Sequence, residues 1–386
     1  MAEFSNTSKK PLVFIVPIEP RNTGNGLAMR AGALCQAAAR LYDVKVVVVP
    51  VSGTPPPVGR IEGLSTLVLP VSDILNKETV RRDELLADRI VRSVPLDHGS
   101  PIFVMRSYLS GVALGVAMRL KSRWIGLDLD DDDETFAVSI GDLRGARQIR
   151  ETLSRVLPAF QIVTASSPFD AQAISRRYGK KVETLVNTVS IPVESTIRRD
   201  PDRSVMFIGN LTYPPNIDAV LRLVNDVLPE LRRMPRGETS KALIVGPFDP
   251  RGPLRVLSGR DDVTLLGFVD DLDALYRRAG VVVIPMEIGS GTRIKVLEAF
   301  AHKVPVVSTP IGVTGIDVRD GRHILIRESP FEIARSVSDL FGNENLCHTL
   351  SSNAHALVLE QYSDIAISSA FSRICLEVEG LVGPTG

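Results

Sequence analysis

The chain has 386 residues, of which 45 are Lys or Arg and 45 are Asp or Glu, so its formal net charge is zero. This balanced charge and an aromatic content of 5% argue against a dedicated nucleic-acid-binding protein, which needs a basic excess and stacking platforms. The apolar fraction of 44% excludes global disorder, and the length predicts two domains.

The cysteines and the apolar segments favour a cytoplasmic protein. Cys35, Cys347 and Cys375 are widely spaced and form no Cys-x-x-Cys pair, which predicts neither a disulfide framework nor a zinc site. The first apolar run, 12–18, is followed by Glu19 without the small residues of a cleavage site. No stretch approaches the ~20 apolar residues that a membrane-spanning helix needs.

Short runs rich in Val and Ile alternate with helical patterns in both halves of the chain. We expect strands at 11–17, 44–50, 101–106, 123–128, 160–165 and 182–186, and then at 204–209, 241–246, 263–266, 280–284 and 304–308. Helical patterns occupy 27–41, 110–121, 144–157, 168–178, 215–233, 270–278 and 292–303, and helix alone continues from 330 to about 380. This alternation predicts an α/β fold with a doubly wound parallel sheet in each half.

A polar stretch at 191–204, with two prolines and clustered charges, interrupts the alternation and predicts a linker that acts as a hinge. We therefore expect a Rossmann-like domain at 1–195 and a second one at 196–386, whose terminal helices can return to the first. Because ligands of open α/β sheets bind at the carboxyl ends of the strands, two such domains predict a cleft between those ends.

The segment 280–309 carries the clearest chemical signal. The loop Gly289–Thr292 follows a buried strand and opens a helix, where free backbone N–H groups suit an anion. Arg293 and Lys295 bring two cations to the first turn, where the helix dipole disfavours positive charge, and a bound diphosphate would account for them. Lys295 and Glu298 share one face, and Glu298 suits the vicinal hydroxyls of a ribose. From spacing alone, an exposed Lys–Glu pair on an ordinary amphipathic helix explains this face equally well.

This segment resembles the donor-site signature of the retaining glycosyltransferases of family 4, the group 1 enzymes of GT-B architecture. The resemblance rests on GSGTRIKVLEAFAHKVPVVST at 289–309, VMFIGNLTYPPNIDAV at 205–220, LIVGPF at 243–248 and VTLLGFVDDLDALYRRA at 263–279. The N-terminal half is similar only through its glycine loop and strand pattern.

The resemblance implies a GT-B fold, with two Rossmann-like domains facing across a cleft: an N-terminal acceptor domain and a C-terminal donor domain. It implies retaining transfer of a sugar from a UDP- or GDP-type donor to an acceptor hydroxyl, in glycan, polysaccharide or glycolipid biosynthesis. It also implies that the nucleotide sugar is a co-substrate and that neither a cofactor nor a metal is required.

The site residues follow from the same resemblance. Glu298 matches the glutamate that holds the ribose hydroxyls. The donor-binding positions whose main chain meets the diphosphate, the sugar or the base are Gly209, Phe268, Val269, Gly291, Thr292 and Ile294.

Two departures from the family pattern concern the donor. Ser290 stands where many members have a glutamate that orients the sugar, and Asn210 stands near the position of an Arg and a Lys that clamp the diphosphate. Arg293 and Lys295 would then supply the clamp as catalytic residues. These departures leave two alternatives open: a non-catalytic glycosyltransferase-like partner protein, and a GT-B nucleotide-sugar epimerase.

The N-terminal half contributes a glycine loop to the predicted donor site. Gly24, Asn25 and Gly26 open the first long helix, but Met29 replaces the third glycine of a dinucleotide fingerprint. The resemblance implies that this loop faces the donor phosphates. An ordinary turn before a helix is the alternative.

The acceptor candidates lie near two later strands. At the acidic run 128–134 we expect Asp130 to accept a proton as a catalytic residue and Asp128 to bind the acceptor, with a metal site or a solvated helix start as alternatives. His98, Arg106 and Tyr108, which flank strand 101–106, are further acceptor-binding candidates.

Basic residues recur at 144–155 and 176–181. They form either a solvated face or a surface that holds a lipid-bearing acceptor at the inner face of a membrane.

Overall fold

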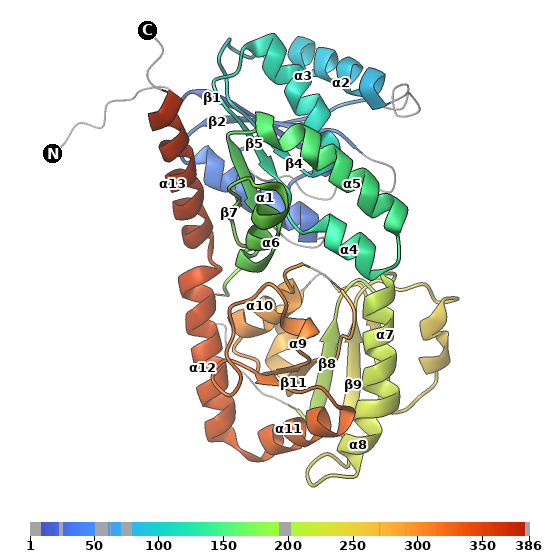
Figure 1. Cartoon of the computed structure of the whole chain (residues 1–386). Coiled ribbons are helices and arrows are strands. Elements are labelled where there is room, and N and C mark those ends of the chain that lie inside the picture. Colours follow the sequence, from blue (N-terminus) through green and yellow to red (C-terminus); the bar gives the residue numbers. More distant parts are fainter. Residues whose placement is uncertain are drawn as a thin grey trace, which may run out of the picture. The chain divides into compact units, whose positions relative to one another are not determined.

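The computed structural model of the chain divides into two compact units, residues 1–188 with 364–386 and residues 189–363 (Figure 1). It describes residues 9–22, 26–50, 61, 63–70, 79–192, 202–269, 271–289 and 291–382. The predicted boundary between 195 and 196, and most of the predicted linker, lie outside these residues.

The first unit is built on a parallel sheet with the strand order β3-β2-β1-β4-β5-β6-β7. Its strands are β1 Pro11–Val16, β2 Asp43–Val48, β3 Ser65–Val68, β4 Ile102–Met105, β5 Ile125–Asp128, β6 Ile162–Ala165 and β7 Glu183–Thr184. The helices are α1 Gly26–Ala39, α2 Thr79–Ser93, α3 Ser110–Leu120, α4 Asp133–Ser139, α5 Leu143–Val156, α6 Pro168–Tyr178 and α13 Asp364–Val382. Strands are added toward one edge of the sheet from β1 to β3 and toward the other edge from β4 to β7. This change between β1 and β4 is that of a doubly wound Rossmann-like sheet.

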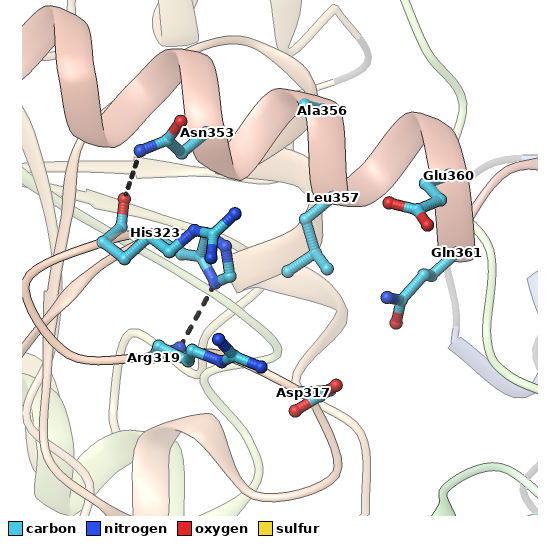
Figure 2. Close-up of a pocket in the computed structure, with 9 residues that line it drawn as sticks. Asp317, Arg319, His323, Asn353, Ala356, Leu357, Glu360 and Gln361 are labelled. Atoms are coloured by element: carbon cyan, nitrogen blue, oxygen red, sulfur yellow. Dashed lines mark hydrogen bonds between the residues drawn. The ribbon is translucent and has the colours of Figure 1, made fainter.

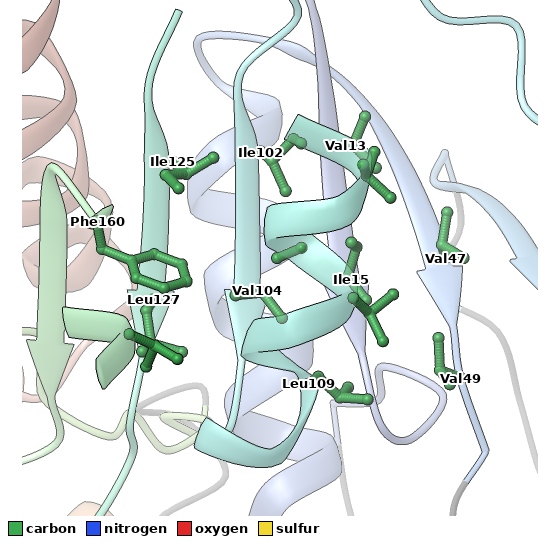
Figure 3. Close-up of a cluster of buried hydrophobic side chains, with 14 of the residues drawn as sticks. Val13, Ile15, Val47, Val49, Ile102, Val104, Leu109, Ile125, Leu127 and Phe160 are labelled. Atoms are coloured by element: carbon green, nitrogen blue, oxygen red, sulfur yellow. The ribbon is translucent and has the colours of Figure 1, made fainter. Parts of the chain in front are cut away.

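Alternating side chains of the central strands fill one core on each face of this sheet. Val13 and Ile15 of β1 point into one cluster (Figure 3). Helices α2, α3 and α5 contribute buried side chains to the same cluster. Leu12 and Phe14 point to the other face, where α1 and α13 pack. The last helix of the chain thus belongs to the first unit, and its Phe371 ring lies 5.3 Å from that of Phe103.

The second unit repeats the plan with the strand order β10-β9-β8-β11-β12-β13, again parallel throughout. Its strands are β8 Ser204–Ile208, β9 Lys241–Val245, β10 Val263–Gly267, β11 Val281–Ile284, β12 Val306–Ser308 and β13 Leu325–Ile326. The helices are α7 Pro214–Arg222, α8 Leu228–Arg232, α9 Asp273–Arg278, α10 Ile294–Ala301, α11 Pro330–Gly342 and α12 Glu344–Gln361. The predicted α/β class, with one doubly wound sheet in each half, is confirmed.

Two glycines shape the carboxyl end of the sheet in the second unit. Gly246, after β9, has a φ of 135°, and a Cβ there would lie 1.8 Å from the carbonyl oxygen of Gly209. The amide of Gly209 in turn donates to the carbonyl of Val245 over 3.0 Å. Any side chain at 246 would push the two loops apart, so glycine is required for the close approach of the chain at this edge.

Two further observations concern membranes and metals. Within the residues described, no helix is long and apolar enough to cross a bilayer. The same residues contain no group of three or more His, Cys, Asp or Glu side chains arranged to hold a metal ion.

Candidate functional site

The Lys295 side chain is half-buried as a whole, and its ammonium is enclosed at the carboxyl end of β8 by Gly209, Asn216 and the Phe207 ring. It donates to the Asn216 Oδ1 over 2.7 Å and lies 4.4 Å from the centre of the Phe207 ring. A Cβ at Gly209 would come within 2.9 Å of Nζ, so the absence of a side chain at this position makes room for the cation. Lys295 therefore reaches from α10 to the end of β8. It lies next to the loop at Asn210, where many members of the resembled family have an Arg and a Lys.

The partners of Lys295 are neutral. Among the described residues, no carboxylate forms an ion pair with its ammonium. Burial, followed by repulsion from Arg293, lowers the pKa of Lys295 to about 7, although Glu298 acts in the opposite direction. An amine in these surroundings is poised to gain an anionic partner.

Asn216 orders this corner because both ends of its amide are engaged. Its Nδ2 donates to the carbonyl of Asn210 over 2.8 Å, while its Oδ1 accepts from Lys295. The Asn210 side chain accepts from the amide and the hydroxyl of Thr212, so it closes a turn. The Tyr-x-Pro-Asn motif thus supplies a positioning amide, a role that its sequence did not reveal.

The loop before α10 is packed around Arg293. The guanidinium is 7% exposed, and its Nε donates to the carbonyl of Ile311 over 3.4 Å. A Cβ at Gly289, whose φ is 134°, would lie 2.7 Å from Nη2. Gly291 also has a positive φ, 78°, and Thr292 lies against Gly315. Ser290 lies outside the described residues.

Glu298, one turn further along α10, accepts a hydrogen bond from the buried hydroxyl of Tyr276 over 3.1 Å. Burial raises its pKa, while this hydrogen bond and the charges of His302 and Lys295 oppose the rise. The face predicted to carry Lys295 and Glu298 is partly open, whereas Val296 and Leu297 are fully buried. Ile294 is half-buried.

Phe268 and Val269 follow β10 at the same carboxyl edge of the sheet. The Phe268 side chain is 65% exposed, and Gly267 before it has a φ of 67°. Since Gly209, Lys295, Gly289 and Gly291 also lie at the carboxyl ends of strands of this sheet, the structure gathers most of the predicted donor residues along one edge.

A separate hollow in the second unit contains none of the predicted site residues. It lies between α12 and the loop before β13, and it is lined by Asp317, Arg319, Arg322, His323, Asn353, Ala356, Leu357, Glu360 and Gln361 (Figure 2). Its polar groups bond one another: Asn353 donates to the carbonyl of Arg322, and the amide of Arg319 donates to His323. Because its lining includes both acidic and basic side chains, the hollow shows no preference for an anion or a cation.

In the first unit the acidic run is neutralised by arginines. Arg30, on α1, is 2% exposed and clasps Asp128 with Nε at 2.8 Å and Nη2 at 2.6 Å. Asp128 also accepts from the Thr164 hydroxyl over 2.6 Å. Asp128 is fully buried, and both carboxylate oxygens are engaged, so these contacts give it a structural role; its binding of an acceptor stays a prediction.

Asp130 lies between two guanidinium groups. Its carboxylate is 3.3 Å from Arg30 Nε and 3.4 Å from Arg106 Nη1. Burial, followed by the charge of Asp131, raises the pKa of Asp130 to about 7 despite these arginines. Asp130 and Arg106 both have left-handed backbone, with φ of 65° and 73°, a strained conformation that accumulates at functional sites.

The rest of the run starts a helix. Asp132 caps α4 by accepting from the Thr135 amide over 3.1 Å, and Arg177 pairs with Asp132 and with the buried Glu134. The run therefore starts a helix, as one of the alternatives held, but its carboxylates are largely buried and paired with arginines and not solvated.

The predicted acceptor residues do not all come together. Arg106 and Tyr108 follow β4 at the carboxyl edge of the sheet, beside Asp130. His98 lies in the exposed turn before β4, at the amino edge. The segments before and after a parallel strand lie on opposite edges of the sheet, so His98 lies apart from Arg106 and Tyr108, and its binding of an acceptor stays a prediction. Gly26 begins α1, whereas Gly24 and Asn25 lie outside the described residues.

Residues 202–343 match the family model described as "Glycosyl transferases group 1". This segment is similar to the group 1 glycosyltransferases, and the match covers less than half of the chain. The match covers all the strands of the second unit, together with Lys295, Arg293 and Glu298.

Two curated proteins are similar to part of the chain. An uncharacterized glycosyltransferase of Methanocaldococcus jannaschii is 31% identical over 180 residues, which make up 43% of this chain and 42% of the relative. A 44.6 kDa protein from the cps region of Klebsiella pneumoniae is 24% identical over 185 residues, 44% of this chain and 45% of that protein. The chain thus spans less than half the length of these curated relatives.

Solved structures resemble almost the whole chain. HepE from Anabaena, in complex with UDP and glucose, has a TM-score of 0.67 at 14% identity and covers 95% of this chain and 99% of its own. Sucrose-phosphate synthase from Thermosynechococcus elongatus has a TM-score of 0.71 at 14% identity, covering 96% and 99%. The glycosyltransferase WaaG has a TM-score of 0.64 at 12% identity, covering 94% and 99%. The fold is of the GT-B class, with two Rossmann-like sheets.

The pairing of Arg30 with Asp128 generates a stability prediction. Asp128→Asn removes the bidentate ion pair of a buried guanidinium and leaves the longer contact with Asp130, so we expect a loss of about 3–5 kcal/mol, or a Tm lower by about 6–20 °C. Scanning calorimetry of the full chain measures the shift. The control is Glu377→Gln, which removes the exposed pair with Arg373 on α13 and should cost less than about 0.5 kcal/mol. Equal shifts in both variants would contradict the structural role.

Proposed function

We propose that the protein is a retaining glycosyltransferase that moves a sugar from a UDP- or GDP-sugar to an acceptor hydroxyl. The observation that carries the proposal is the enclosed Lys295 ammonium, which lies beside Gly209 and whose partners among the described residues are neutral. A diphosphate bound at this edge of the sheet would supply the missing negative charge. The domain match to group 1 glycosyltransferases supports this choice of anion.

The proposed reaction depends on stabilising the departing nucleoside diphosphate. Lys295 and Arg293, at the N-terminus of α10, are placed to offset the charge that develops on the diphosphate as the sugar leaves. We propose that these cations do this without a metal. Glu298 would hold the ribose, and the chain around Phe268 and Val269 would meet the base, as the resemblance to the family implies.

On the acceptor side we propose Asp130 as the group that takes the proton from the attacking hydroxyl. Its pKa, raised to about 7, would let it exchange a proton near neutral pH. Arg106 and Tyr108 flank it as acceptor contacts. The sugar, the base and the acceptor itself are not specified by these residues.

We also propose contact with the inner face of a membrane through the hairpin of α4 and α5. Val138, Ile140 and Leu143 at its tip are 50%, 55% and 68% exposed, and Arg144 and Arg147 lie exposed just beyond them. Exposed apolar side chains beside arginines suit an anionic lipid surface. A lipid-bearing acceptor would then be within reach of this unit.

Donor turnover tests the proposed activity. A thermal-shift screen with UDP- and GDP-sugars should raise the Tm with one donor, because a ligand at 100 times its Kd stabilises by about 2.7 kcal/mol. Incubation of that donor with acceptor extracts should release the free nucleoside diphosphate. Conversion of the sugar without release would instead identify an epimerase, and binding without either reaction a partner protein.

The charge of Lys295 generates a pH prediction. Below pH 7 the free protein carries the ammonium that attracts the diphosphate; above pH 7 the ammonium loses its proton, and binding must restore it at about 1.36 kcal/mol per pH unit. Calorimetric affinity for UDP or GDP should therefore fall up to about tenfold per unit between pH 7 and 9. Lys295→Arg should flatten this profile, and Lys295→Met should weaken binding at least about tenfold at pH 7.

Lys241→Met, at the amino end of β9, is the matched control for Lys295→Met and should bind like the wild type. If Lys295→Met binds the diphosphate within twofold of wild type at pH 7, Lys295 is not the clamp.

Vesicle cosedimentation tests the membrane contact. We expect binding to vesicles that contain phosphatidylglycerol and none to pure phosphatidylcholine, since lysines and arginines near an anionic surface contribute about 1 kcal/mol each. Arg144→Glu with Arg147→Glu should release the protein, whereas the same exchange at Arg81 and Arg92 of α2 should not. Equal binding to both vesicle types would rule out the proposed contact.

A further inference from the structure

A buried tyrosine supports the carboxylate of Glu298 from the protein side. Tyr276, on α9, is 1% exposed, and its hydroxyl donates to the Glu298 Oε2 over 3.1 Å. Tyr276 lies within the segment 263–279 that resembles the family, but the resemblance implies no role for it. The hydroxyl has one proton, and Glu298 is the acceptor that it reaches, so this bond defines where one carboxylate oxygen lies.

The ring of Tyr276 is itself fixed by His302. The two rings stack with centroids 4.3 Å apart and planes 19° from parallel. The His302 Nδ1 lies 2.7 Å from the carbonyl of Glu298, and its Nε2 lies 2.8 Å from the Asp273 carboxylate. Both neighbours are hydrogen-bond acceptors, so the single N–H of a neutral imidazole donates to one of them, and the ring stack with Tyr276 adds a further contact that holds the ring.

These contacts connect α9 with α10. Asp273 begins α9 and holds His302 just beyond the end of α10, while Tyr276, one turn along α9, holds Glu298. A short helix of six residues is thereby attached to α10 by two polar contacts and one ring stack. The result is a Glu298 side chain whose position is set by another element and not by its own rotamer preference.

We propose that Tyr276 is a positioning residue that aims Glu298 at the ribose and thereby sets the preference for ribonucleotides over 2′-deoxyribonucleotides. The proposal rests on the proposed function, because it takes the Glu298 carboxylate as the ribose acceptor. An ionised carboxylate has about four lone-pair sites, so the bond from Tyr276 leaves acceptor capacity for both hydroxyls of a ribose. A carboxylate free to rotate would pay a conformational cost before it could accept from two hydroxyls at once.

The charge around the carboxylate supports this arrangement. Burial favours the protonated form and raises the pKa of Glu298, while the Tyr276 hydroxyl and the charges of His302 and Lys295 favour the carboxylate. Removal of the hydroxyl should therefore weaken the ribose contact in two ways: the oxygen loses its fixed position, and the anionic form loses a donor.

The test compares ribo- and deoxyribonucleotides by calorimetry. Affinities of the full chain for UDP and 2′-deoxy-UDP, and in parallel for GDP and 2′-deoxy-GDP, give a discrimination ratio for the base that binds. Wild type should prefer the ribonucleotide, and Glu298→Gln should abolish most of this preference. Tyr276→Phe should lower the ratio about three- to tenfold, the effect of one hydrogen bond, through weaker binding of the ribonucleotide alone.

Tyr362→Phe is the matched control. Tyr362 is also 1% exposed, and its hydroxyl accepts from the Asp317 amide over 2.9 Å, so the variant loses a buried tyrosine hydrogen bond elsewhere in the same unit. Its discrimination ratio should equal that of wild type. Should Tyr276→Phe unfold at a much lower temperature than this control, His302→Gln, which keeps the Tyr276 hydroxyl, should lower the ratio in the same direction.

The outcomes separate the inference from the proposed function. Wild type that binds neither diphosphate removes the proposed function and the inference with it. If wild type prefers the ribonucleotide and the ratio is unchanged in both Tyr276→Phe and His302→Gln, the proposed role of Tyr276 is wrong while the proposed function stands. If Tyr276→Phe lowers the affinity equally for the ribonucleotide and the 2′-deoxyribonucleotide, Tyr276 is merely structural, and this also overturns the proposal.

Discussion

In each unit a charged side chain is buried at the carboxyl edge of a parallel sheet, and its need for partners orders the loops around it. Taking a charge out of water costs several kcal/mol unless it is paired or hydrogen-bonded. Arg30 meets this need with Asp128 and Asp130, and so connects α1 with the loop after β5. Lys295 meets it with an amide oxygen and an aromatic face, and so connects α10 with the ends of β8 and α7.

Arg30 and Lys295 differ in whether the chain itself supplies their counter-charge. The guanidinium of Arg30 is neutralised by carboxylates that the chain itself provides, so the first network is complete as a structural element. Lys295 has neutral partners among the described residues, and its pKa falls to about 7 because of burial and of Arg293. Of Arg30 and Lys295, it is therefore Lys295 that gains a counter-charge by binding an anion.

Much of the fold followed from the sequence. Continuous apolar runs such as 44–50 and 280–284 became buried strands, since their β-branched residues are covered on both faces. The short edge strands β3 and β13 were missed. Ser65–Val68 is half-exposed and Leu325–Ile326 has two residues, so neither has the apolar run that identifies a central strand.

The residues of the proposed donor site could be grouped from the sequence because its glycines and charges lie close together there. Gly289, Arg293 and Glu298 fall within ten residues and show their spacing directly. The acidic run could not be assigned, because its arginine partners at 30, 106 and 177 come from distant elements. Pairing over such separations is a property of the folded chain.

The same reasoning explains why Asn216 and Tyr276 escaped notice. Each acts on a charged residue of α10 that lies 79 or 22 positions away along the chain. Each also has an ordinary local explanation: Asn216 can be read as a turn amide after two prolines, and Tyr276 as an apolar ring in a short helix. The two side chains hold Lys295 and Glu298 at fixed points, and no local pattern in α10 requires them. A site that must bind a diphosphate and a ribose at once needs such fixed points, because each freely rotating side chain would add an ordering cost to binding. If this edge of the sheet binds a nucleoside diphosphate as proposed, its specificity depends on neutral residues as much as on the charged ones.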